Sequence, residues 1–192
     1  MKKLLALFTI TMLLFAACQD NNNPVEPSSS TIDNSAAISN PNWIALPANT
    51  QMGVEQDFST SKLVKGSEET LLEINAGYPG GIHYYTSITA NLRFQRNSFV
   101  GERFVTMTVN DEYGKGTFSP SGTFLKPAIY NITLVGLDLT GVNPNNVKFV
   151  YMATDGKYYQ TNYQSLYVNV NEGKIVLQNA LLPHFSRYGF VQ

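Results

Sequence analysis

The stretch Arg103–Asn110, RFVTMTVN, decides the fold of this chain. Apolar Val105, Met107 and Val109 occupy every second position, and threonine fills the positions between them. Successive side chains of a strand point to opposite faces, so this period of two predicts a strand with one buried face and one exposed face.

Comparable short runs lie on both sides of this strand. Asp155-Gly156 separates two of them, and two-residue hairpin turns favour this dipeptide because it tolerates positive φ. Asn171-Glu172-Gly173 repeats the arrangement, and we find no helical periodicity that predicts a helix after Cys18. Many short strands at regular spacing predict an all-β fold, an antiparallel β-sandwich. The further strands that we expect are Thr70–Ala76, Ile82–Ile88, Thr89–Phe94, Ala128–Val135, Val147–Ala153, Lys157–Thr161, Leu166–Val170, Lys174–Gln178 and His184–Val191.

The part of the chain before these strands is less regular. Residues 18–41 hold few large apolar side chains, so they cannot bury enough surface to offset the entropy of ordering. We expect a flexible tether over 18–41 and a folded β-sandwich domain over 42–192. Trp43, Ile44 and Leu46 could dock as a strand, although nearby prolines interrupt any longer element.

The first residues have the layout of an export signal. Lys2 and Lys3 precede an uncharged run, Leu4–Ala17, which ends directly before Cys18, the only cysteine. This pattern predicts a secretory signal peptide over residues 1–17. The run is shorter than the roughly 20 apolar residues that cross a membrane comfortably.

The end of this run, Phe15-Ala16-Ala17-Cys18, resembles the lipobox of bacterial lipoproteins, with Phe15 where the family usually has an aliphatic residue. The resemblance implies that a diacylglyceryl group is attached to the Cys18 thiol and that the chain is cut just before it. Two or more acyl chains hold a protein stably on a membrane. We therefore expect a lipid-anchored protein of the bacterial cell envelope, at the outer membrane or the cell surface. The alternative is an ordinary secretory peptide that leaves Cys18 as a free thiol.

Charge and composition exclude several functions. Removing Lys2 and Lys3 with the signal peptide leaves 11 of the 13 basic residues against 14 acidic ones, a net charge of −3. A nucleic-acid partner would need a basic stripe, so we expect none. With His83 and His184 as the only histidines and no calcium-loop spacing of acidic residues, we expect no metal and no cofactor. One cysteine allows no intrachain disulfide, and we expect a monomer.

Three segments are together similar to the ZU-five domain, a β-sandwich first described in tight-junction scaffolds, netrin receptors and ankyrins. They are Ala90–Val109 (ANLRFQRNSFVGERFVTMTV), Phe118–Ile132 (FSPSGTFLKPAIYNI) and Leu182–Phe190 (LPHFSRYGF). The resemblance covers about residues 69–192. It implies a β-sandwich that serves mostly for interaction and packing, and hence a non-enzymatic role.

The tripeptide His184-Phe185-Ser186 suggests one catalytic alternative. The same tripeptide marks a self-cleavage site in some ZU-five-containing proteins. There, the Ser186 hydroxyl would attack the Phe185 carbonyl while His184 takes its proton, and the resulting ester would be hydrolysed. Residues two apart on a strand share a face, so His184 and Ser186 could act together. The alternative is a structural role in a closing strand.

A group of tyrosines and amides suggests a binding surface. Aromatic rings bury apolar area while neighbouring amides form hydrogen bonds, which suits a glycan or a peptide. The alternative is that these tyrosines pack in the sandwich. The candidate residues are Tyr158, Tyr159, Gln160, Asn162, Tyr163 and Tyr167. From the sequence we therefore expect an envelope lipoprotein with an interaction or structural module, and no catalysis on external substrates.

Overall fold

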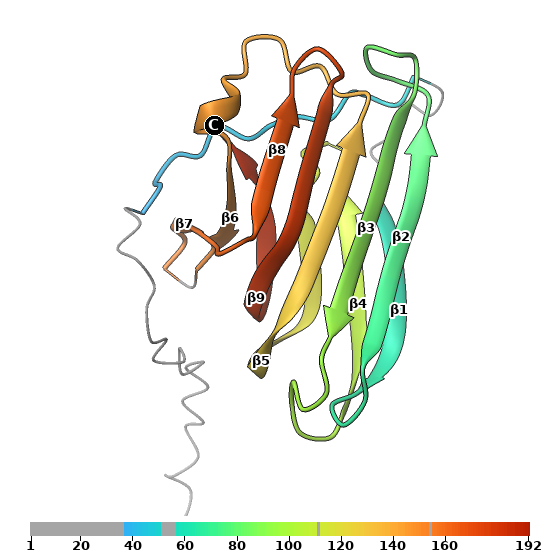
Figure 1. The fold of residues 1–192 in the computed structure, drawn as a ribbon, viewed down its shortest axis with the longest axis vertical. Helices are drawn as coiled ribbons and strands as arrows, with labels where there is room; N and C mark the ends of the chain where they lie inside the picture. The colour runs from blue at the N-terminus through green and yellow to red at the C-terminus, as the bar shows by residue number, and fades with distance from the viewer. Residues whose placement is uncertain (1–36, 51–56, 111, 154) are drawn as a thin grey trace, which may run out of the picture.

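The computed structural model describes residues 37–50, 57–110, 112–153 and 155–192. Over these residues the fold is all-β and antiparallel, which confirms the prediction from the alternating pattern. The described elements are β1 (Asp57–Lys65), β2 (Thr70–Tyr78), β3 (Thr86–Phe94), β4 (Glu102–Asn110), β5 (Gly116–Val135), the 3-10 turn η1 (Pro144–Asn146), β6 (Lys148–Met152), β7 (Tyr158–Gln160), β8 (Ser165–Asn169) and β9 (Lys174–Val191), as Figure 1 shows.

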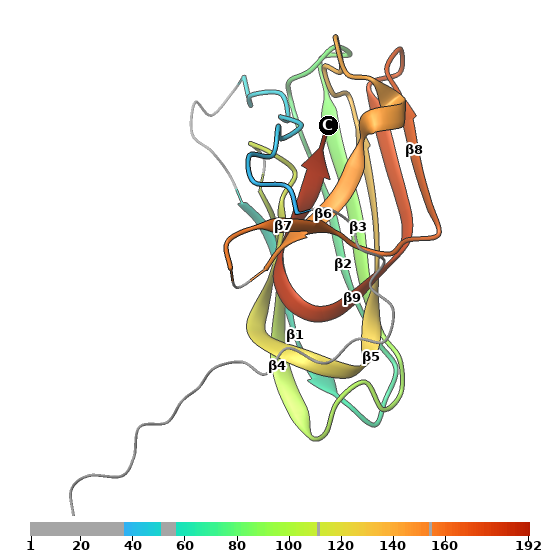
Figure 2. The ribbon, with the colours of Figure 1, turned by 90° about the vertical axis from the view of Figure 1, so that its left-hand side faces the viewer.

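Two long strands, β5 and β9, each run through both layers of the sandwich (Figures 1 and 2). Residues 128–135 of β5 pair with the first half of β9, and residues 87–93 of β3 pair with this same half of β5. The first half of β5 pairs instead with β4 and with the end of β9. The pairing of β5 with β9 is irregular between Thr117 and Ala128, where both strands turn from one layer into the other.

The two layers, which we call A and B, are therefore joined by β5 and β9, each of which contributes one half to each layer. Layer A contains β2, β3, β8, the second half of β5 and the first half of β9. Layer B contains β1, β4, β6, β7 and the remaining halves of β5 and β9. The segment between β7 and β8 links the layers, because Thr161 N donates to Phe149 O and Asn162 O accepts from Leu181 N.

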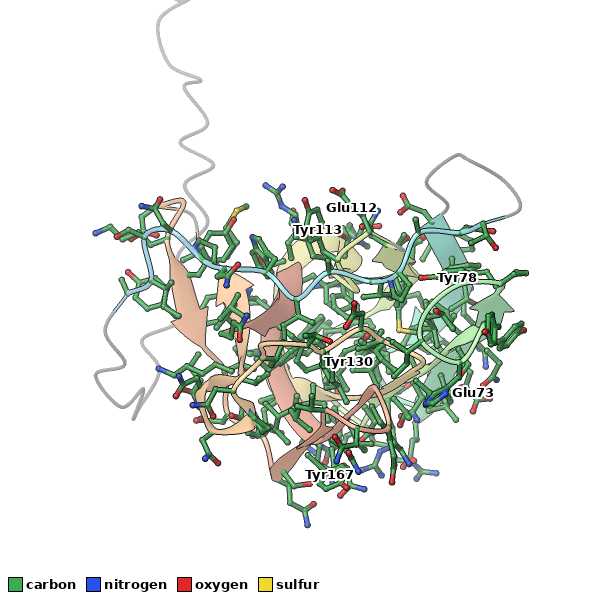
Figure 3. All side chains as sticks on the ribbon, turned by 90° about the horizontal axis from the view of Figure 1, so that it is seen from above. Glu73, Tyr78, Glu112, Tyr113, Tyr130 and Tyr167 are labelled. Carbon is green, nitrogen blue, oxygen red and sulfur yellow. The ribbon has the colours of Figure 1, made fainter. Side chains whose placement is uncertain are left out.

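The core lies between the layers and is rich in aromatic rings. Val105, Met107 and Val109 are each 0% exposed, so the alternation in RFVTMTVN is confirmed. The ring of Phe118 lies 5.1 Å from that of Tyr130, which Figure 3 shows in the middle of the molecule. Aromatic side chains bury the largest apolar areas, so these contacts contribute strongly to holding the layers together.

One predicted strand starts four residues too early, whereas most of the others differ from the observed ends by one or two residues. The predicted strand Ile82–Ile88 begins at Thr86 in the structure, as the start of β3. Gly80, Gly81 and Tyr84 have φ values of 158°, 82° and 61°, which lie outside the strand region and hold the preceding residues in a loop.

Other predicted strands are parts of longer ones. Lys174–Gln178 and His184–Val191 both belong to β9, and Ala128–Val135 is the second half of β5. A strand that bends between two layers changes which side chains face the core. The apolar pattern therefore breaks along the strand, and the sequence divides it into two.

The two predicted hairpins have different outcomes. The hairpin around Asn171-Glu172-Gly173 is confirmed, since Asn169 pairs with Lys174 across it. The hairpin after β6 is longer than the predicted two-residue turn, because Ala153 N donates to Lys157 O at 2.9 Å.

Residues 37–50, the N-terminal segment, pack against layer B without forming a strand longer than an isolated bridge. Ile44 N donates to Phe190 O at 3.0 Å, and the side chains of Ile44 and Leu46 are buried in the core. Docking of this segment is therefore as predicted, but it is irregular.

The structure describes contacts of the folded part that precede residue 42, the predicted start of the domain. Ile38 exchanges backbone hydrogen bonds with Tyr158 at 2.8 and 3.2 Å, so the folded part includes Ile38. The predicted signal peptide, Cys18 and the rest of the tether up to residue 36 lie outside the described residues. Where the structure describes the chain, no helix is long and apolar enough to cross a membrane.

Candidate functional site

The outer face of layer B is divided into a covered half and an open half. Over β9 and β6, the indole of Trp43 lies on the sheet at Gly189, where a Cβ atom would approach the ring to 2.7 Å. Only glycine leaves room for the ring there. Val150, which pairs with Gly189, is 0% exposed. Trp43 therefore covers this half. In the part of the chain that the structure describes, the outward side chains of the other half, formed by β1, β4 and the start of β5, stay exposed or half-buried.

Two side chains pack against the Trp43 ring. The ring of Tyr158 in β7 meets it edge-on, with 5.1 Å between centroids. The ammonium of Lys115 lies 4.6 Å from the centroid of Trp43 and 4.2 Å from that of Tyr113. A cation over an aromatic face is attracted by the ring quadrupole, so Lys115 links the two rings.

The electrostatics of Lys115 reflect this packing. Burial lowers the pKa of its ammonium below the usual value, and the positive charge of Arg187 acts in the same direction. The negative charge of Glu112 raises the pKa and partly offsets the burial.

The connection from β4 to β5 is shaped by one amide. Asn110 Oδ1 accepts hydrogen bonds from the backbone N–H groups of Glu112 and Tyr113 at 3.0 and 3.2 Å. Asn110 Nδ2 donates to Asp57 Oδ1 at 3.0 Å. An Asn side chain that bonds its own backbone two residues on is a standard way to fix a turn. Asn110 therefore positions Tyr113 and ties the turn to β1.

A groove of about 360 Å³ lies at this turn, on the outer side of layer B. Its lining combines two carboxylates, one ammonium, hydroxyls, an amide and one aromatic ring. Figure 3 shows Glu112 and Tyr113 on one side of the molecule and Tyr167 on the opposite side. The residues that line the groove are Asp57, Thr108, Asn110, Glu112, Tyr113, Lys115 and Thr117.

Next to the groove, along β1 and β4 toward Leu63 and Phe104, the open half presents rows of hydroxyl groups. Ser59 Oγ and Thr108 Oγ1 are 3.0 Å apart, and the hydroxyls of Ser61 and Thr106 are 2.7 Å apart. Leu63 pairs with Phe104 in the next row, and these two side chains are 52% and 64% exposed. We call this surface the open face, formed by the outward side chains Ser59, Ser61, Leu63, Phe104, Thr106, Thr108, Thr117 and Ser119.

The tripeptide His184-Phe185-Ser186 lies on β9 at the turn between layers. Ser186 Oγ donates to the Met152 carbonyl at 2.5 Å, so its proton is directed to β6 and not to His184. The His184 ring meets Tyr151 edge-on at 5.0 Å. Phe185 is 5% exposed. In the structure, therefore, the Ser186 hydroxyl bonds to β6, the His184 ring packs on Tyr151, and Phe185 is buried in the core.

The predicted tyrosine surface is divided between separate places. Tyr158 lies on the outer side of layer B against Trp43, whereas Tyr167 is 52% exposed on β8 in layer A. Tyr163 packs partly against the core, where burial raises the pKa of its phenol. The structure therefore does not bring these tyrosines together into one platform.

The remaining predicted residues of this group also have local partners. Tyr159 Oη donates to Asp155 Oδ2 at 3.0 Å, and Gln160 Nε2 donates to Tyr163 Oη at 3.3 Å. The backbone carbonyl of Asn162 accepts from Leu181 N. These contacts fix the β6–β7 hairpin and its exit to β8.

The described residues contain neither a candidate metal site nor the predicted lipidation site. In the described ranges, no group of three or more His, Cys, Asp or Glu side chains could hold a metal ion. The predicted lipidation site, Cys18, lies outside those ranges.

The comparisons with known proteins found nothing: no family model, no curated protein and no solved structure matches this chain. The function is therefore inferred from the site and the sequence alone.

Sequence reasoning missed the groove, although one signal was present. The pattern of Arg103–Asn110 places Thr106 and Thr108 on the exposed face of a strand, and this face is the one that carries the hydroxyl rows. The covered half of layer B could not be predicted from the sequence, because Trp43 and Lys115 meet only through tertiary packing.

Proposed function

We propose that this protein is a lipid-anchored lipoprotein of the bacterial cell envelope whose β-sandwich is a non-enzymatic binding module. The anchor is inferred from the lipobox-like sequence ending at Cys18. The observation that carries the binding role is the open face with its adjoining groove. One half of the outer side of layer B is covered by Trp43, and the other half exposes Phe104 and ordered hydroxyls.

The geometry supports binding better than catalysis. Ligand sites in proteins are concave and combine apolar surface with a few placed polar groups, which describes the groove and the open face. Hydroxyls that already bond to one another lose less freedom when a ligand arrives, so the face is preorganised. Self-cleavage at Ser186 is the weaker proposal, because the hydroxyl donates to Met152 O.

The relationship of residues 69–192 to the ZU-five domain also stays a proposal. The two-layer antiparallel topology is of the class that this resemblance implies. Fold class alone does not define a family or a function.

Intact mass spectrometry of the protein from native membranes tests the anchor. We expect a chain that starts at an acylated Cys18 and ends at Gln192. In a Cys18→Ser variant, we expect the processed and acylated form to disappear and the protein to leave the membrane fraction. An unacylated wild-type chain would reject the anchor. A chain ending at Phe185 would instead establish self-cleavage, and Ser186→Ala would then abolish it.

A pull-down from the envelope tests the binding role. The wild-type protein should recover an envelope component that a Phe104→Ser variant recovers poorly, and Tyr167→Ser serves as the matched control on the opposite side. Equal recovery by all three proteins would reject the open face as the binding surface.

A further inference from the structure

We propose that the open face binds a neutral polysaccharide, which runs along β4 from the groove at Asn110 to Phe104. This inference rests on the proposed function, because it names the ligand class of the same surface. The chemistry of the surface, its length and its charge each point to this occupant.

The chemistry of the open face matches a sugar chain. A polysaccharide presents hydroxyls that both donate and accept hydrogen bonds, and also patches of C–H bonds. Serine and threonine hydroxyls likewise donate and accept. They form the paired rows Ser59–Thr108 and Ser61–Thr106, and Thr117 continues the first row because it pairs with Thr108. The exposed ring of Phe104 beside Leu63 offers apolar area for the C–H patches.

The dimensions favour an extended ligand over a small one. A strand rises about 3.3 Å per residue, so Asn110 and Phe104 are separated by about 20 Å along β4. Neighbouring strands lie about 4.8 Å apart, which gives the face on β1, β4 and β5 a width of about 10 Å. A flat strip of this shape suits a chain of several sugar rings lying along the strands.

The charges favour a neutral chain. The serines, threonines, Leu63 and Phe104 of the open face carry no charge, and the charged side chains at its border balance one another. Three are acidic and three are basic, so the border attracts neither a polyanion nor a polycation; they are Asp57, Glu102, Glu112, Lys65, Lys115 and Arg187. The ammonium of Lys115 lies over two aromatic rings, so an anionic group of a ligand would have to compete with these cation–π contacts.

A saccharide array with the full-length protein in detergent micelles tests this inference. The probes are cellohexaose, xylohexaose, mannohexaose, chitohexaose and maltohexaose, with the acidic hexagalacturonate for comparison. We expect binding to at least one neutral hexasaccharide and weaker binding to the acidic one. Phe104→Ser should weaken the binding about tenfold. Thr117→Arg, on the same face and exposed, should weaken it similarly.

The matched control is Tyr167→Ser. Tyr167 is an exposed aromatic residue like Phe104 but lies in layer A, so its replacement should leave the binding unchanged. Circular dichroism melts of all variants verify that each one is folded. If Phe104→Ser does not fold, Thr117→Arg decides the question, because its side chain lies on the surface.

Several outcomes would overturn the inference. They are binding of none of the neutral hexasaccharides, equal binding by wild type and Thr117→Arg, or a dimer by sedimentation that Thr117→Arg dissociates. Capture of an envelope protein on this face, with no saccharide bound, would also overturn it and leave the proposed function standing. An unacylated Cys18 would instead reject the anchor and leave the saccharide site standing.

Discussion

Replacing Trp43 by alanine should lower the free energy of unfolding by about 3 kcal/mol. The half-buried indole removes roughly 100 Å² of apolar surface from water, which at about 25 cal/mol per Å² contributes about 2.5 kcal/mol. The edge-on contact with Tyr158 adds about 0.5 to 1.5 kcal/mol, and some relaxation of the surroundings offsets part of this total. Trp43 thus stabilises the domain although it lies on the outer side of a layer.

Urea unfolding followed by far-ultraviolet circular dichroism measures this loss, because the variant has no tryptophan to report by fluorescence. Tyr167→Ala is the control, and its expected change is below about 0.5 kcal/mol because the side chain is exposed. A double-mutant cycle with Lys115→Met should give a coupling of about 0.5 to 1 kcal/mol for the cation over the ring. A loss below about 1 kcal/mol for Trp43→Ala, with no coupling to Lys115, would refute the reasoning.

Three further predictions concern the core and the cover. Tyr130→Phe should stabilise the domain by about 1 kcal/mol, because the buried Tyr130 hydroxyl has no hydrogen-bond partner in the described structure. Tyr188→Phe should destabilise it by about 1 kcal/mol, because it removes the hydrogen bond from Tyr188 Oη to His184 O. Urea midpoints of the two variants that shift in the same direction would contradict this contrast. Burial raises the pKa of both phenols above the unfolded value of 10.0. The free energy of unfolding should therefore be unaffected by these two groups below pH 10.0 and should fall as the pH rises above it. The Tyr130→Phe/Tyr188→Phe double variant should show a weaker fall. Gly189→Val should displace Trp43, seen as a red shift of the single-tryptophan emission, and an unshifted spectrum would show that the ring does not lie there.

The fold was largely predictable from the sequence, and the reason is visible in β4. Its alternating valines and methionine face one core, so local pattern and tertiary burial agree. The long strands β5 and β9 were not predictable as single elements, because each changes layer and so changes which side chains face inward. Tyr84 is a similar case, since its positive φ lies inside the segment Ile82–Ile88, which the sequence pattern predicts as one strand.

The candidate site was less predictable than the fold. The tyrosine-rich sequence predicts that Tyr158 and Tyr167 belong to one binding surface, but their strands, β7 and β8, lie in different layers. Residues close in sequence are separated whenever the chain crosses between layers. Conversely, Trp43 and Lys115 are far apart in sequence and meet because the N-terminal segment docks on the end of β9.

Photo-crosslinking in the cells that make the protein tests the open face most directly. A photoreactive amino acid at Thr108 lies on the central strand of the open face, beside the groove, and the same group at Tyr167 lies on the opposite layer. The open face as the binding surface predicts an adduct with an envelope component at Thr108 and none at Tyr167. Adducts at Tyr167 alone, or equally at both positions, would contradict it.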